Sequence, residues 1–193
     1  MTADPGFDVA RAHEYFATEC FNRCWQLIDK PERTSDEDEQ MLLMSQASLW
    51  HWSQRDDYAP DKLAVGQWQL ARVHALAGRP QEAVRHAQRS LEVARDFNAA
   101  SATAIAADMP AVASDVVAAG VDPERAGEPG HGAELDDGPA YLLAYAHEAM
   151  ARAMAVAGDA EASEFHRAEA MRLAREIDDA ALRERLLADV DSL

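Results

Sequence analysis

Histidine and cysteine side chains near the N-terminus have a spacing that could place metal ligands on one helix face. His13, Cys20 and Cys24 stand at i, i+7 and i+11, which brings them nearly into line along a helix. Thiolate and imidazole ligands suit Zn²⁺ or Cu⁺. The stretch has no CxxC pair and no second pair of ligands, and free cysteine is among the most buried residue types. We therefore predict a packed core stripe here, with no metal bound.

Three other histidines could meet in space although they lie on separate helices. His51, His74 and His147 belong to stretches with helical periodicity, and no HxxxH or HExxH spacing places two histidines on one helix. They support an alternative hypothesis, a helical sensor or enzyme that binds a small molecule or metal between helix hairpins. The sequence has no GxSxG, no GxGxxG and no phosphate-cradling glycine loop, so it predicts no catalytic residue and no cofactor.

The composition describes an acidic chain with enough apolar residues for a core. Its 193 residues fit one domain, 48% of them are hydrophobic, and the formal net charge is −17. Such a charge repels phosphate backbones, so we expect no nucleic-acid partner. No apolar run is long enough to span a bilayer, and the first residues lack the basic start and apolar run of a signal peptide. We therefore expect a cytoplasmic protein that does not contact membranes.

Apolar residues recur with the period of a helix, and the alternation typical of strands is almost absent. The predicted fold class is therefore all-α. Gly78 is followed by Pro80, a pattern that ends one helix and starts the next, and Gly158 marks a similar break. These signals predict three antiparallel helix hairpins and a C-terminal helix, over about residues 8–55, 60–97, 139–177 and 179–191.

The segments on either side of the two glycine breaks are similar to each other. When Gly78 is aligned with Gly158, Ala71 matches Ala151 and Arg72 matches Arg152. The matched alanines are small residues of the kind that recurs where two helices must approach closely.

With Leu70, Ala71, Gly78, Ala83 and Leu91 in the expected places, the first of these segments resembles the tetratricopeptide repeat (TPR). That repeat is a helix–turn–helix unit of about 34 residues. The second segment departs from the pattern because Ser163 replaces the usual alanine. The stretch FNRCWQLIDKPERTSDEDEQML, followed by ASLWHW, is similar to bacterial proteins of TPR-like build. The resemblance implies a right-handed TPR-like superhelix closed by a C-terminal capping helix, but no activity.

In TPR solenoids the first helix of each hairpin lines a concave groove, which implies where this chain would bind a ligand. Arginine fits carboxylates with its planar fork, and tryptophan offers a rigid apolar surface. The resemblance therefore implies a non-enzymatic module that binds a protein or peptide segment, with a homodimer as a further candidate assembly. The simpler alternative is that the arginines form ion pairs with the protein's own carboxylates. The groove residues that we predict are Asn22, Trp25, Trp68, Arg72, Tyr145, Glu148 and Arg152.

The stretch SLWHWS places Trp50 and Trp52 about 200° apart on a helix. A helix that rests on a single core can bury only one of them. In a stacked array an inner helix is covered on two sides, so we predict that both indoles are buried.

Residues 98–138 form a predicted insertion, with a short helix around Val112, Val116 and Val117 and a mobile loop over 121–138. Replacing residues 121–137 with a short Gly/Ser linker should leave the thermal unfolding midpoint within a few degrees, because long surface loops are thermodynamically cheap to exchange. Limited proteolysis of the unaltered chain should cut first between about residues 122 and 137. A large loss of stability on replacement would show that this segment packs against the helices.

Overall fold

The computed structural model describes residues 6–107 and 138–193, and every regular element within these ranges is a helix. This confirms the predicted all-α class for the described part of the chain. No described helix has the length and apolar character needed to cross a membrane. The described helices are α1 (Val9–Ile28), α2 (Ser35–Ser53), α3 (Pro60–Leu76), α4 (Pro80–Ala107), α5 (Gly138–Ala157), α6 (Ala160–Ala174) and α7 (Ala180–Asp191).

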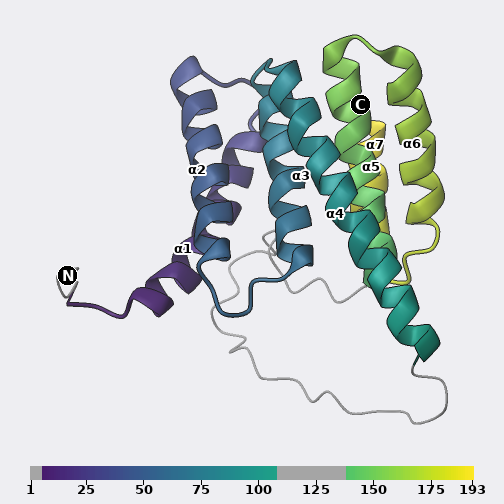
Figure 1. The fold of residues 1–193 in the computed structure, drawn as a ribbon. Coiled ribbons are helices and arrows are strands. Elements are labelled where there is room, and N and C mark those ends of the chain that lie inside the picture. The colour runs from purple at the N-terminus through teal and green to yellow at the C-terminus, as the bar shows by residue number, and fades with distance from the viewer. Residues whose placement is uncertain (1–5, 108–137) are drawn as a thin grey trace.

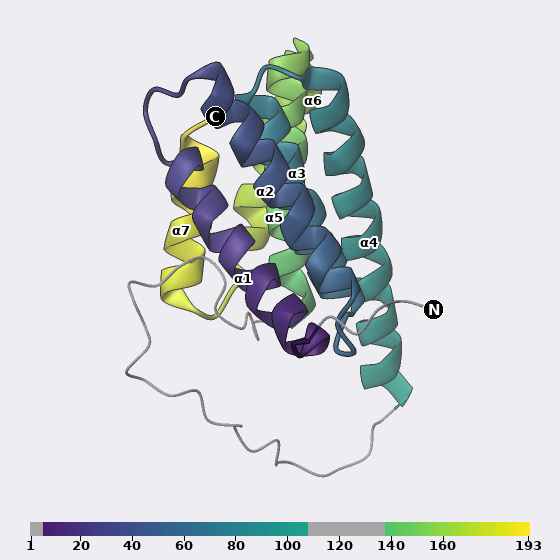
Figure 2. The same cartoon turned by 90° about the vertical axis from the view of Figure 1, so that its left-hand side faces the viewer.

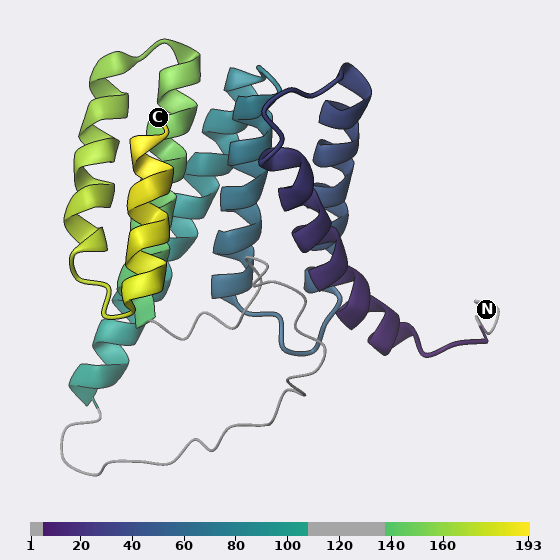
Figure 3. The same cartoon turned by 180° about the vertical axis from the view of Figure 1, so that it is seen from behind.

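The helices form antiparallel pairs that stand side by side in chain order (Figure 1). α1 packs on α2, α3 on α4 and α5 on α6, while contacts of α2 with α3, α3 with α5 and α4 with α5 join the pairs. α7 packs against α5 and α6 and lies on the same face of the array as α1 (Figure 2, Figure 3). Apolar side chains from all of these helices form one continuous buried cluster.

The two glycine breaks predicted from the sequence make the same turn. Gly78 and Gly158 follow α3 and α5 with φ angles of 67° and 83°, a region that is costly for residues with a Cβ atom. The residue after each glycine donates its N–H to the carbonyl four positions before that glycine, at 2.9 Å after α3 and 3.0 Å after α5. This hydrogen bond closes the last turn of the helix and directs the chain back along it.

Each helix pair is also joined by one serine hydroxyl that donates to a backbone carbonyl of the pair's first helix. The bond from Ser163 explains how α6 tolerates a serine where the tetratricopeptide pattern has alanine, because a half-buried hydroxyl at a helix contact needs a partner. The three bonds are Ser48 to Ala17 (2.7 Å), Ser90 to Ala64 (2.9 Å) and Ser163 to Ala151 (2.9 Å).

Two sequence predictions, on the end of α4 and on the burial of the tryptophans of α2, were wrong. The fourth helix continues to Ala107, past its predicted end at Phe97, because the stretch that follows is rich in alanine, the strongest helix former. Trp50 is 55% exposed, because α2 stands at the end of the array and, among the described helices, packs on α1 and α3 alone. Trp52 is half-buried, with the Arg55 guanidinium 4.1 Å from its ring centroid. The predicted short helix and loop of the insertion lie outside the described residues.

Candidate functional site

An aromatic cluster joins the first helices of the three hairpins. The Trp68 indole of α3 lies between Trp25 of α1 and Tyr145 of α5, with ring centroids 5.5 Å and 4.9 Å away. All three side chains are buried. Burial also raises the pKa of the Tyr145 hydroxyl, so this residue stays neutral at physiological pH. The cluster forms a largely apolar floor across α1, α3 and α5.

A buried carboxylate lies beside this aromatic floor and connects α3 with α5. Glu148 has no exposed surface, and its Oε2 accepts a hydrogen bond from the Trp68 indole N–H at 2.7 Å. Its Oε1 accepts from Arg152 Nε at 2.8 Å and from Arg72 Nη1 at 3.4 Å. A fully buried charge is tolerated only when such donors surround it. Glu148 therefore depends on both arginines.

The same two arginines also hold the C-terminal end of α7. Arg72 Nη2 is 2.7 Å from Asp189 Oδ1, and the Arg72 guanidinium carbon lies 5.2 Å from the centroid of the Trp25 ring. Arg152 Nη2 donates to the Asp189 carbonyl oxygen at 3.0 Å and to the Ser192 hydroxyl at 2.9 Å. Burial raises the pKa of the Asp189 carboxyl, and the charge of Arg72 opposes this rise.

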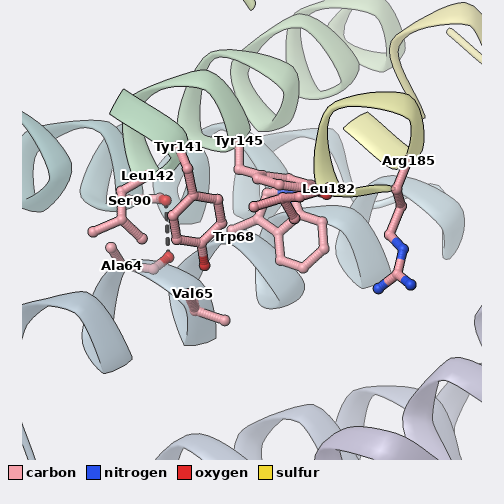
Figure 4. A pocket seen from close by; sticks show the side chains of 9 residues that line it. All are labelled: Ala64, Val65, Trp68, Ser90, Tyr141, Leu142, Tyr145, Leu182 and Arg185. Carbon is pink, nitrogen blue, oxygen red and sulfur yellow. Dashed lines mark hydrogen bonds between the residues drawn. The ribbon is translucent and has the colours of Figure 1, made fainter. Parts of the chain in front are cut away.

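A small cavity lies between α3, α5 and α7 near the aromatic floor (Figure 4). Its volume is about 20 Å³, enough for about one water molecule. The rings of Trp68, Tyr141 and Tyr145 gather on one side, whereas the Arg185 side chain extends away from them. The lining residues are Ala64, Val65, Trp68, Ser90, Tyr141, Leu142, Tyr145, Leu182 and Arg185.

The structure brings most of the predicted groove residues into one contact network. Trp25, Trp68, Arg72, Tyr145, Glu148 and Arg152 are linked by the contacts above. Asn22 lies on α1 and is half-buried, and its buried Oδ1 has no hydrogen-bond partner among the described residues. The network is largely buried, and Arg72 and Arg152 form ion pairs with the protein's own carboxylates, as the simpler alternative held.

The residues of α7 in this network were missed by the sequence analysis. Asp189 stands three positions after Leu186 and directly before Val190, at the edge of the apolar stripe of α7. A carboxylate at that position indicates a polar group at the border of a helix–helix contact. Nothing in the sequence shows that its partner is an arginine on α3.

The histidines proposed as a shared ligand site lie instead in separate pairs. His51 of α2 bonds His13 of α1, with 2.9 Å between the two Nδ1 atoms, and His74 of α3 stacks on His86 of α4 at 5.1 Å between ring centroids. His147 bonds His166 across α5 and α6. No group of three or more His, Cys, Asp or Glu side chains in the described ranges could hold a metal ion.

The cysteines also lie apart from a ligand set. The Cys24 thiol is buried and donates to the Met41 carbonyl oxygen of α2 at 3.4 Å. Burial raises its pKa to about 12, so the thiol stays protonated, as expected for a core residue. Cys20 is half-buried, and His13 is engaged with His51. The predicted core stripe is therefore confirmed at Cys24.

Two of the interhelical histidine contacts are equivalent in the repeat. The offset that aligns Gly78 with Gly158 also aligns Gln67 with His147 and His86 with His166. His86 Nδ1 donates to Gln67 Oε1 at 2.7 Å, and His147 and His166 bond through their Nδ1 atoms at 2.9 Å. Burial lowers the pKa of both His86 and His147 to about 4. These imidazoles are therefore neutral at physiological pH and join the two helices of each hairpin.

Comparisons of the chain with protein-family models, with curated proteins and with solved structures found no match.

Glu148→Gln should lower the free energy of unfolding by about 3 kcal/mol or more, because it leaves Arg72 and Arg152 buried without their shared countercharge. Urea unfolding followed by circular dichroism measures the change. The matched control is Glu164→Gln, since that side chain on α6 is 71% exposed and pairs with Arg167 at 3.7 Å. We expect the control to change stability by less than about 1 kcal/mol. Equal losses for the two variants would contradict a central role for Glu148.

Acidification from pH 7.5 to 5.5 should destabilise the fold through its buried histidines. A histidine in the unfolded chain has a pKa of about 6.5, so it becomes protonated below that pH. His147 in the folded chain stays neutral over the same range, so protonation stabilises the unfolded state. Stability is lost as the pH falls from about 6.5 toward the folded pKa of about 4. His147→Gln copies the Gln67–His86 pair and removes one such group. Thermal unfolding should show that the variant loses about 1 kcal/mol less over this range. Parallel pH profiles would contradict this account of His147.

Proposed function

We propose that this protein is a non-enzymatic module that binds a protein or peptide segment on the face formed by α1, α3 and α5. The proposal includes a TPR-like build, in which the hairpins stack into a right-handed superhelix, these three helices line its concave groove and α7 caps the last hairpin. The observation that carries it is the convergence of Arg72 and Arg152, from equivalent repeat positions, on the last turn of a helix.

The repeated local geometry supports the TPR-like part of the proposal. The turns at Gly78 and Gly158 have the same hydrogen bond, and every hairpin has a serine that bonds the carbonyl of its mate. Alanines at Ala71, Ala83 and Ala151 are buried where the paired helices approach each other. Small residues at such positions let two helix backbones come close, which favours regular stacking of similar hairpins.

The chemistry of the face supports a polypeptide ligand. Its buried aromatic rings form a rigid apolar contact area beside α7, and its arginines already donate to a carboxylate and to a backbone carbonyl at the end of that helix. Tryptophan, tyrosine and arginine are the residue types that contribute most to protein–protein binding. The formal net charge of −17 disfavours a nucleic-acid partner. The free thiols of Cys20 and Cys24 suit a reducing compartment, so the proposal places the module in the cytoplasm.

A displayed library of 16-residue peptides, selected on the full chain, tests the proposal. Val65 lines the cavity and is half-buried, so Val65→Arg adds bulk and charge at the face without emptying the core. Enriched peptides should bind Val65→Arg at least about tenfold more weakly, the loss typical of a disturbed binding centre. The matched control is Leu43→Arg on α2, where the leucine is 66% exposed.

We expect the control to bind the enriched peptides like the unaltered chain. If the peptides bind both arginine variants equally well, the α1/α3/α5 face is not their binding site. Selection that enriches no peptide on any of the three proteins would contradict peptide binding itself.

A further inference from the structure

The C-terminal helix makes contacts that reach beyond the hairpin on which it packs. α7 lies against α5 and α6, yet its last turn reaches Arg72 of α3, in the neighbouring hairpin. Leu182 of its first turn lines the cavity beside Trp68 (Figure 4). α7 therefore covers part of the same floor and the same arginines that we assign to ligand binding.

The way α7 binds this face is that of an amphipathic helix in a groove. Leu182, Leu186 and Val190, at i, i+4 and i+8, are buried, whereas Glu184 and Ala188 on the opposite side are exposed. At the C-terminal end, Asp189 supplies a carboxylate to Arg72 and a backbone carbonyl to Arg152. Apolar anchors on one face with charge pairing at one end are the features by which grooves recognise helical ligands.

Two features indicate that α7 can be replaced on this face. It has only 12 residues, and helices of that length are marginal in water, so its helical state depends on the surface that it covers. Its polar fit is also incomplete, because Arg72 Nε and Asp189 Oδ2 are buried without hydrogen-bond partners among the described residues. Such orphaned groups weaken binding, and a ligand that satisfied them would bind more tightly.

We propose that α7 is a displaceable intramolecular ligand, and that the partner of this face is an amphipathic helix of another protein. That helix would carry apolar residues at i, i+4 and i+8 and an Asp or Glu at i+7, the pattern of Leu182, Leu186, Asp189 and Val190. This inference rests on the proposed function. Residues 175–179 tether α7 to α6, and a short tether gives α7 an effective concentration on the order of millimolar. The tethered helix thus lowers the apparent affinity for any external helix.

The test uses the full chain and a fluorescein-labelled synthetic peptide of residues 178–193 as the probe, with binding measured by fluorescence anisotropy. Asp189→Asn in the chain removes the charge pair between α7 and Arg72 and substitutes no residue of α1, α3 or α5. The matched control is Asp191→Asn, because that carboxylate is 71% exposed and its partner is Arg167 of α6, at 3.6 Å. The peptide should bind Asp189→Asn at least about tenfold more tightly than the unaltered chain or the control.

Hydrogen exchange of the α7 amides gives an independent measure of release. Leu186→Asp provides a stronger variant, since Leu186 is fully buried, and circular dichroism checks that its remaining helices stay folded. Both release variants should exchange their α7 amides faster than the control. A peptide that carries the Asp189→Asn change should bind the released chain more weakly than the unaltered peptide does.

The outcomes separate this inference from the proposed function. Unchanged α7 exchange in both release variants, or equal and tight peptide binding by all proteins, would overturn the inference alone. Release of α7 without any peptide binding would overturn the proposed function as well. A dimer in native mass spectrometry that exchanges α7 between copies would show that the partner is a second copy of this chain and would overturn a foreign partner.

Discussion

The pairing of the buried Glu148 carboxylate with its donors is the interaction on which the face formed by α1, α3 and α5 depends. A carboxylate without any exposed surface must be surrounded by donors, and here the donors come from Trp68 and Arg72 of α3 and from Arg152 on the next turn of α5. This requirement holds α3 and α5 in one relative position. The aromatic floor and the directions of both arginines follow from that position, and so does the docking of α7.

The arginines serve both the fold and the proposed binding face. Each donates to Glu148 on one side and to the last turn of α7 on the other. Because the Glu148 contact holds each guanidinium in place, little further conformational entropy is lost when a second carboxylate or carbonyl binds. A prearranged fork of this kind suits recognition of a helix end.

Two kinds of polar contact repeat along the array and keep each hairpin in register. The serine-to-carbonyl bond recurs in all three pairs of helices, and a hydrogen bond of a histidine side chain crosses every pair. A buried polar group has few acceptable partners, so such contacts select one register among those that apolar packing alone would permit. α7 packs on α5 and α6 but belongs to none of the three hairpins among the described helices. It is held by its apolar stripe and by the two arginines.

The sequence by itself determined the helices and their pairing, because these follow from short-range chemistry. Apolar periodicity and the breaks at Gly78 and Gly158 act over a few residues, and the repeated Arg72 and Arg152 could be recognised by alignment. Trp68 and Glu148, like Arg72 and Arg152, occupy matching positions in the aligned segments, and these residues lie together in the structure. Only the tertiary structure decided what covers them, because the pairing of Arg72 with Asp189 joins residues that are far apart in the chain. Exposure of Trp50 was decided in the same way, since it depends on whether another helix stands beyond α2.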